Sequence, residues 1–192
     1  TITGRIANSS SGVIASDTGE AILVDGTSAI LGGLSTSGIL RGATNAISNA
    51  GFVQGTHGLS FYASSVIGNI LNTGLIQGTN SGTTNGYGIY AKQTNIRDSL
   101  INTGTVFGSK AGIYLATGST VQGGLTNTGL LTSSSQAGVA LASSTMGGSI
   151  VNELCGTISG ITEGIYLLNS GIDGSISNSG LIIASKGYGF QF

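Results

Sequence analysis

The stretch 100–108, LINTGTVFG, decides the fold, because close copies of it return along the chain. The copies are ISNAGFVQG at 47–55, ILNTGLIQG at 70–78, LTNTGLLTS at 125–133 and ISNSGLIIA at 176–184. Each has an apolar residue near its start, an Asn, a Gly two places later and further apolar residues. Such self-similarity at a fixed spacing is the sequence signature of a repeat architecture.

The repeated Asn defines a column that we expect to run along the molecule. From Asn72 onward its spacings are 30, 25, 25 and 26 residues. We place Asn8, in IANSSSGVIA, at the head of this column, and Thr36 of LSTSGILRG as a weak member. The predicted Asn ladder is therefore Asn8, Asn49, Asn72, Asn102, Asn127, Asn152 and Asn178.

A second phrase lies between the Asn copies. It reads EAILVDG at 20–26, GYGIYAK at 86–92, AGIYLAT at 111–117, AGVALAS at 137–143 and EGIYLLN at 163–169. One turn of the chain, or rung, then holds three short strands: the approach to Asn, the apolar residues after Gly, and this second phrase. A period near 25 residues with three strands per turn predicts an all-β, single-stranded parallel β-helix of about seven rungs.

The predicted coil is right-handed, as parallel crossover connections nearly always are. At about 4.8 Å per rung it is a rod roughly 35 Å long, and we expect 1–192 to be a single β-helix domain. Alternation along the strands tells which side chains face the core. The expected inward columns are Ile89, Ile113, Val139 and Ile165; Ala91, Leu115, Leu141 and Leu167; and Ile70, Leu100, Leu125, Ile150 and Ile176. Tyr90, Tyr114, Ala140 and Tyr166 should face outward.

The Asn-x-Gly pair should mark a sharp bend between two strands. Asn and Gly both tolerate the left-handed backbone that such a bend requires, and stacked Asn side chains can hydrogen-bond along the axis. Two corners depart from the pattern: 78–86 forms a longer polar loop, and 151–160 has two extra residues between Asn and Gly, which predicts a wider corner. The register of 43–56 stays open, because its Asn follows Thr36 by only 13 residues.

The composition excludes several classes of function. Only 7% of residues are charged, against about 25% in ordinary soluble domains, and the formal net charge is −1. There is no basic surface for nucleic acid and no apolar run of the roughly 18 residues that a membrane span needs, so we expect neither partner. The single cysteine, Cys155, permits no internal disulfide and is expected to be a small buried hydrophobe.

No group of residues predicts catalysis, a metal or a cofactor. Of the seven acidic residues, Asp25, Glu163 and Asp173 fall in different rungs and columns, whereas polysaccharide cleavage needs carboxylates that share a face. The only His, His57, is remote in sequence from Cys155, and no cluster has metal-ligand spacing. Columns of Thr-x-Thr could bind ice, but only Thr126/Thr128 makes such a pair beside the Asn column. We therefore expect a non-enzymatic protein without cofactors.

The phrases INTGTVFG, GIYLATGSTVQGGLTNTGLL and GIYLLNSGIDGSISNSGLI resemble the repeats of bacterial autotransporter passenger domains, the secreted arms of type V secretion. The resemblance covers nearly the whole chain. It implies a right-handed β-helix that is exported and held outside the cell, with roles in adhesion, self-association and biofilm formation, and in some members protease or toxin activity. The family's signal peptide and C-terminal barrel are missing, which leads us to expect a segment of a longer passenger.

The outward Tyr column is the best candidate for binding. It has two interpretations, an aromatic ladder that stabilises neighbouring strands or a platform for sugar rings or for another copy of the chain. The predicted contact face comprises Tyr90, Tyr114 and Tyr166 with Asn80, Thr83 and Asn85 of the polar loop.

The predicted function is a cell-surface or secreted adhesin, self-association module or stalk. Its partner would be a host or bacterial surface, protein or glycan, or a second copy. The alternative is a carbohydrate-binding or carbohydrate-cleaving β-helix.

Overall fold

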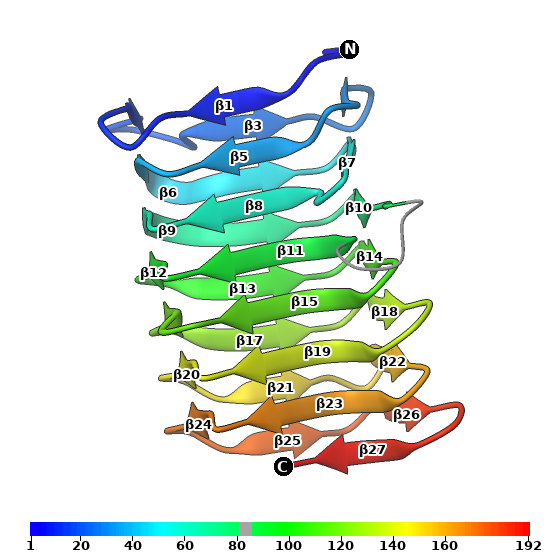
Figure 1. Cartoon of the computed structure of the whole chain (residues 1–192). Coiled ribbons are helices and arrows are strands. Elements are labelled where there is room, and N and C mark those ends of the chain that lie inside the picture. Colours follow the sequence, from blue (N-terminus) through cyan, green and yellow to red (C-terminus); the bar gives the residue numbers. More distant parts are fainter. Residues whose placement is uncertain (81–85) are drawn as a thin grey trace.

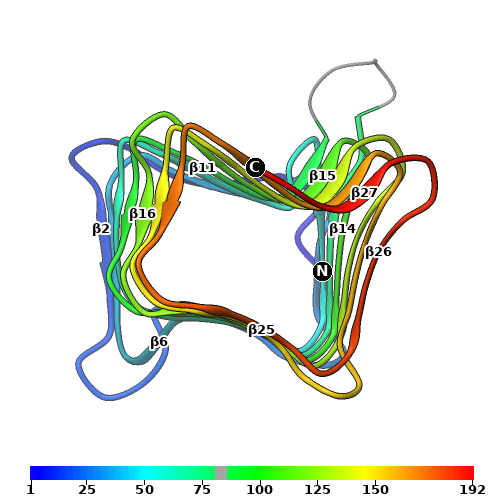
Figure 2. The same cartoon turned by 90° about the horizontal axis from the view of Figure 1, so that it is seen from below.

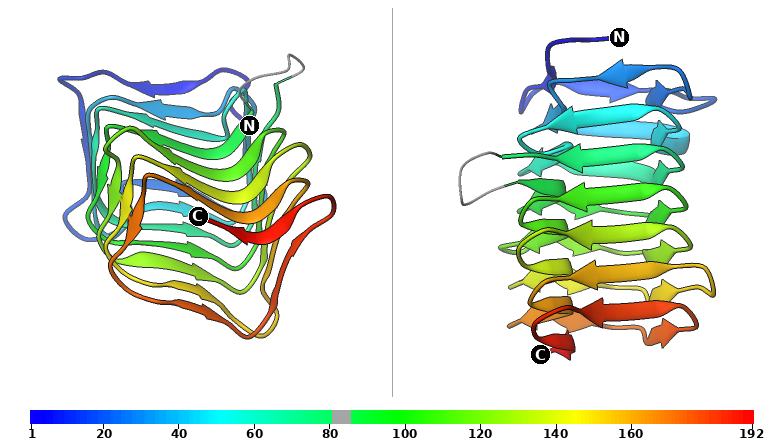
Figure 3. Two further views of the ribbon diagram at one scale, coloured as in Figure 1. Left: turned by 60° about the horizontal axis from the view of Figure 1, so that its bottom comes forward. Right: turned by 90° about the vertical axis from the view of Figure 1, so that its right-hand side faces the viewer.

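The computed structural model describes residues 1–80 and 86–192, and these residues form an all-β solenoid of stacked parallel strands (Figure 1). The strands in front of Figure 1 run to the left while the chain descends from the N-terminus, so the coil is right-handed. The two termini lie at opposite ends of the rod (Figure 3). The predicted β-helix of about seven turns is confirmed.

The described strands form three sheets. The eight-stranded sheet contains β1 (Ile6–Asn8), β5 (Leu34–Thr36), β8 (Leu59–Tyr62), β11 (Tyr87–Lys92), β15 (Ala111–Ala116), β19 (Ala137–Ala142), β23 (Glu163–Leu168) and β27 (Tyr188–Gln191). The seven-stranded sheet contains β4 (Ala29–Ile30), β7 (Phe52–Gly55), β10 (Leu75–Gly78), β14 (Thr105–Gly108), β18 (Leu130–Ser133), β22 (Thr157–Gly160) and β26 (Leu181–Ala184).

The twelve-stranded sheet contains two strands from most turns, and one long strand each, β6 (Ile39–Asn49) and β9 (Ser65–Asn72), from the second and third turns. The others are β2 (Val13–Ala15), β3 (Ile22–Val24), β12 (Asn95–Ile96), β13 (Ser99–Asn102), β16 (Thr120–Val121), β17 (Gly124–Asn127), β20 (Thr145–Met146), β21 (Ile150–Asn152), β24 (Gly171–Ile172) and β25 (Ile176–Asn178). Most of these turns therefore add a two-residue strand, such as β12, to the three strands expected, and the cross-section has four sides (Figure 2).

The core consists of the predicted inward columns. Ile89 pairs in register with Ile113, Ile113 with Val139 and Val139 with Ile165, and all four are buried. The column from Ile70 to Ile150 is likewise buried, whereas Leu167 and Ile176 in the last turns are half-buried and pack against the core. Fully burying such a side chain stabilises the fold by about 1.5–3 kcal/mol, so these columns hold the turns together.

The Asn ladder is confirmed from Asn49 to Asn178. The side-chain Nδ2 of each Asn donates a hydrogen bond of 2.8 Å to the Oδ1 of the Asn one rung further on, until the ladder ends at Asn178. Its members are Asn49, Asn72, Asn102, Asn127, Asn152 and Asn178. All but Asn178 are buried. Asn102 Nδ2 also lies 3.1 Å from the carbonyl oxygen of Gly104 and 3.3 Å from that of Leu130. The ladder therefore satisfies carbonyl groups at the corner as well as its own amides.

The assignment of Asn8 and Thr36 to this ladder was wrong. Asn8 pairs with Thr36 and Thr36 with Phe61, so both belong to the eight-stranded sheet. Conversely, the segment 20–26, which we expected to be the first copy of the second phrase, belongs to the twelve-stranded sheet. There Val24 pairs with Asn49 and occupies the Asn column. The cause is that a second corner has the same chemistry: Asn8 Nδ2 donates to Thr36 Oγ1 at 3.1 Å and to the carbonyl of Gly12 at 3.2 Å. The open register of 43–56 is thereby resolved, because Thr36 and Asn49 lie on different sides of one turn.

The reason expected for the Gly of Asn-x-Gly was also wrong. Gly104 does not have positive φ, but a Cβ there would lie 2.1 Å from the carbonyl oxygen of Gly74 on the preceding rung. Close approach of two backbones, and not left-handed geometry, excludes a side chain. Among the described residues, the non-glycine residues with positive φ lie at another corner, after the strands of the eight-stranded sheet: Ala63, Gln93, Thr117, Ser143 and Asn169.

The wide corner predicted for 151–160 is present. Asn152 Nδ2 donates to the carbonyl of Gly156 across the extra residues, and Leu154 and Cys155 are exposed there. The expectation of a buried cysteine was therefore wrong, because Cys155 lies at the tip of this corner and not in a strand.

Candidate functional site

Four aromatic rings gather on the outer face of the eight-stranded sheet, and we call them the aromatic stack: His57, Tyr87, Tyr90 and Tyr114. The ring centroids of Tyr87 and Tyr90 are 5.1 Å apart, and those of Tyr90 and Tyr114 are 5.9 Å apart. His57 lies 5.2 Å from Tyr87 and 5.0 Å from Tyr90. Three of these five ring pairs are stacked, with interplanar angles of 18–25°, and the other two are tilted by 34° and 40°.

The register of the coil explains part of this cluster. Tyr90 of β11 is the direct partner of Tyr114 of β15, as the outward column predicted. Tyr166 is not part of the cluster, because Ala140 stands between it and Tyr114. The rings of Tyr90 and Tyr114 therefore stack on each other across neighbouring strands. This is the aromatic ladder of the first interpretation.

Sequence reasoning missed Tyr87 and His57. Strict alternation places Tyr87 on the same side as Ile89, yet its ring stacks on the outward Tyr90. Gly88 separates the two Tyr residues, and a Cβ on it would lie 2.5 Å from Val106 Cγ1 of the core. Here the sheet bends inward, as the side formed by β11, β15 and β27 does in Figure 2. The bend turns Tyr87 outward, and the 30-residue turn brings His57 beside it.

Burial sets the charge state of the stack. His57 is half-buried, and this lowers its pKa below the ordinary value of 6.5. Its Nδ1 lies 3.4 Å from the backbone N–H of Tyr87, which donates to it. Burial raises the pKa of Tyr87 and of Tyr90 above the ordinary value of 10, and the neighbouring Tyr114 adds to both shifts. At neutral pH His57, Tyr87 and Tyr90 are therefore uncharged.

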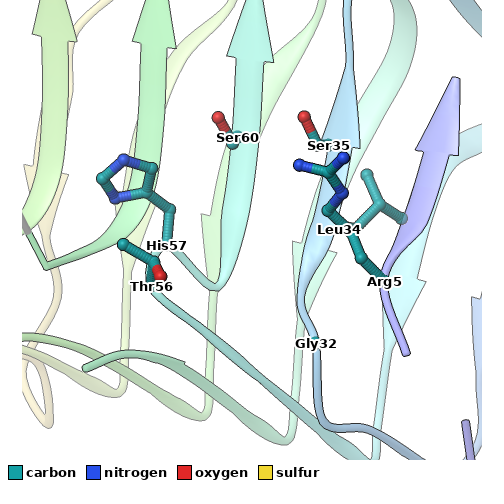
Figure 4. A pocket seen from close by; sticks show the side chains of 7 residues that line it. All are labelled: Arg5, Gly32, Leu34, Ser35, Thr56, His57 and Ser60. Atoms are coloured by element: carbon teal, nitrogen blue, oxygen red, sulfur yellow. The ribbon is translucent and has the colours of Figure 1, made fainter. Parts of the chain in front are cut away.

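A hollow of about 150 Å³ lies on the N-terminal side of the stack. Figure 4 shows His57 at one side of it and Arg5 at the other, with Ser60 and Ser35 between them. Ser35 and Ser60 occupy the same outward column as Tyr90. The aromatic column thus gives way here to small hydroxyl side chains beside one cation.

A second hollow, of about 270 Å³, lies on the C-terminal side, and we call it the Ala140 hollow. Ala140 occupies the outward column between Tyr114 and Tyr166, while Glu163 pairs with Ala137 on the neighbouring column. Thr162 Oγ1 donates a hydrogen bond to Glu163 Oε2. The lining residues are Gln136, Ala137, Ala140, Thr162, Glu163 and Tyr166.

Of the three predicted contact residues in the polar loop, only Asn80 lies within the described residues. The backbone N–H of Asn80 donates to Ser109 Oγ at 3.4 Å, on the corner that leads into β11. Thr83 and Asn85 lie outside the described residues. Within residues 1–80 and 86–192, no three His, Cys, Asp or Glu side chains are grouped so that they could hold a metal ion. Over the same residues, no helix is long and apolar enough to cross a membrane.

Comparisons with models of protein families, with curated proteins and with solved structures gave no match.

Proposed function

We propose that this chain is a non-enzymatic contact protein of the bacterial cell surface, an adhesive β-solenoid that belongs to an autotransporter-like passenger. Its partner is a surface, protein or glycan, or a second copy of the chain, and it acts outside the cell. The observation that supports this best is the arrangement on the eight-stranded sheet. There the aromatic stack lies between two hollows with polar linings on one inward-bent face.

Aromatic side chains favour a contact role because they are enriched in recognition surfaces, where they bury a large area at a small cost in conformational entropy. The stack fixes its rings against one another, so little freedom is left to lose on binding. Lys92 and Lys110 lie over rings at this face, 5.5 Å from the centroid of Tyr62 and 5.8 Å from that of Tyr87. The face thus combines rigid rings, hydroxyl groups and a few cations.

The distribution of carboxylates favours binding over cleavage of a carbohydrate. Glu163 is the only acidic residue on the described strands of the eight-stranded sheet. Glycosidases generally need two carboxyl groups about 5–9.5 Å apart, one of them as acid and the other as nucleophile or base. Since the second carboxyl group is missing from these strands, a glycan on this face would be held and not cut.

A repeated rod suits adhesion through many weak contacts. Each hydrogen bond contributes only about 1 kcal/mol net, so strength must come from many copies acting together. The low charge of the chain helps, because like surfaces then repel one another little.

Display of the chain on a bacterium that otherwise stays dispersed tests the proposal. We expect clumping, or attachment to a host or bacterial surface. The double variant Tyr90→Ser/Tyr114→Ser should abolish it at equal display. Tyr188→Ser is the matched control, because Tyr188 lies on the last strand of the same sheet but is exposed and 65% accessible.

The double variant removes packing as well as a contact surface, so folding must be checked by circular dichroism of the purified chain. A folded double variant that adheres as the parent does would contradict the proposal. A parent that neither clumps nor attaches would leave only a passive stalk.

A further inference from the structure

We propose that the Ala140 hollow binds one sugar ring of a neutral glycan, held against Tyr166. This inference rests on the contact function proposed above and names the chemical class of the partner. It follows from an interruption in the aromatic column and from the polar groups around that interruption.

Along the rod, the outward column of the eight-stranded sheet consists of Ser35, Ser60, Tyr90, Tyr114, Ala140, Tyr166 and Gln191. Tyr90 and Tyr87 both lie against the Tyr114 ring, with centroid distances of 5.9 Å and 4.8 Å, and the next rung continues the column with Ala140. That rung carries only the methyl group of Ala140, and the following one carries Tyr166. One ring is therefore missing from an otherwise aromatic run.

The spacing suits an inserted ring. Two rungs at about 4.8 Å each separate Tyr114 from Tyr166 by roughly 10 Å along the axis. A ring seated over Ala140 would lie one rung, about 5 Å, from Tyr166, which is within the usual 4.5–7 Å range of stacked ring centroids. The hollow of about 270 Å³ lies just below the roughly 300 Å³ of small-molecule sites. It therefore fits one ring and not a long segment of chain.

The rim of the hollow supplies hydrogen bonds in a pattern that suits hydroxyl groups. The Glu163 carboxylate accepts from Thr162 on Oε2, and a carboxylate has about four acceptor sites, so further hydroxyl donors can bind it. The Gln136 amide can donate as well as accept. A sugar ring offers several hydroxyl groups around a flat, partly apolar body, and it matches both the walls and the rim. An apolar side chain of another protein would desolvate the Glu163 carboxylate and leave its remaining acceptor sites unsatisfied, which is unfavourable.

Filling the missing position provides a sharp test. Ala140→Tyr would continue the aromatic column from Tyr114 to Tyr166 and occupy the hollow. Leu154→Tyr is the matched control, since it adds the same ring at the exposed wide corner, outside the eight-stranded sheet, and leaves the Ala140 hollow open. The chain has six Tyr and no Trp, so intrinsic tyrosine fluorescence reports directly on ligands at this face.

The probes are cellohexaose, chitohexaose and maltohexaose, titrated into the whole chain with fluorescence and calorimetric detection. We expect at least one to bind the parent and Leu154→Tyr within about twofold of each other, and Ala140→Tyr to bind about tenfold or more weakly. Tyr166→Ser removes a wall without filling the hollow and should also weaken binding. It keeps the test decisive if Ala140→Tyr does not fold.

Three results would overturn the inference: no binding of any of these oligosaccharides at millimolar concentration, equal binding by Ala140→Tyr and the parent, or saturation of the hollow by free arginine in preference to every saccharide. Cell clumping or attachment that persists in any of these cases would show that the contact function holds without this sugar site.

Discussion

Replacing Asn102 by Ala tests the Asn ladder in its buried middle. The substitution removes an amide whose Nδ2 donates to Asn127 Oδ1 at 2.8 Å and whose Oδ1 accepts from Asn72 Nδ2 at 2.8 Å. It also removes the contacts with the carbonyl groups of Gly104 and Leu130. Asn127 Oδ1, which is buried, then has no donor from the ladder.

The expected cost follows from these contacts. An unsatisfied buried polar atom costs about 1–3 kcal/mol, and each lost hydrogen bond costs about 1 kcal/mol more. Together they should lower the free energy of unfolding by about 3–5 kcal/mol. The same change at Asn178, the exposed end of the ladder, should cost only about 1 kcal/mol, because water replaces the lost partners there.

Equilibrium urea unfolding, followed by tyrosine fluorescence and circular dichroism, measures these differences. Thr103→Ala, at the exposed neighbour of Asn102, is the control and should change stability by less than about 0.5 kcal/mol. The comparison is valid only if the parent and the variants show the same slope of unfolding free energy against urea concentration. A different slope would indicate that part of the solenoid unfolds before the rest. Equal costs at Asn102 and Asn178 would refute the argument that burial of the ladder sets its contribution.

Three further outcomes are expected from the same structure. Val24→Asn should leave stability within about 1 kcal/mol of the parent in urea unfolding, since it would donate to Asn49 Oδ1, which is buried without a partner among the described residues. Val53→Asn, equally buried but outside the ladder, should cost about 2 kcal/mol or more, and similar costs at the two sites would contradict this reasoning. Thr117→Gly should raise the thermal midpoint, because an exposed β-branched residue at φ 48° carries a left-handed strain of about 1–2 kcal/mol; a lowered midpoint would show that the strain is absent. The folded-state pKa of His57 lies below its unfolded value of 6.5, so unfolded chains take up the proton first and stability should fall as pH drops below about 6.5. Urea midpoints measured against pH should show this loss in the parent and lose it in His57→Asn, whereas an identical pH profile would assign the loss to other groups.

The period of the sequence was enough to predict the core and most of the ladder. A parallel coil places residues one period apart in contact, so Ile113 and Val139, or Asn102 and Asn127, could be paired by counting alone. The first turns were assigned wrongly because two corners of the coil use the same amide chemistry. Asn8 satisfies its own corner as Asn152 does, and sequence spacing does not distinguish the two corners.

The candidate site could be predicted only in part. Tyr90 and Tyr114 followed from alternation and register. Tyr87 did not, because the inward bend at Gly88 reverses the alternation that places it in the core. His57 could have been found from its spacing, since it precedes Tyr87 by 30 residues, the same interval that separates Asn72 from Asn102.

The central claim is that contact occurs through the outer face of the eight-stranded sheet, and blocking that face tests it most directly. The native Cys155 is exposed at the wide corner between β21 and β22, away from this face (Figure 2), and serves as a built-in control site for a maleimide-linked polymer. In a Cys155→Ser background, Ser60→Cys places the same polymer beside Tyr90. We predict that cells displaying the chain stop clumping or attaching when residue 60 is modified and continue when Cys155 is modified. Persistent adhesion with residue 60 blocked, or equal loss at both sites, would contradict the claim.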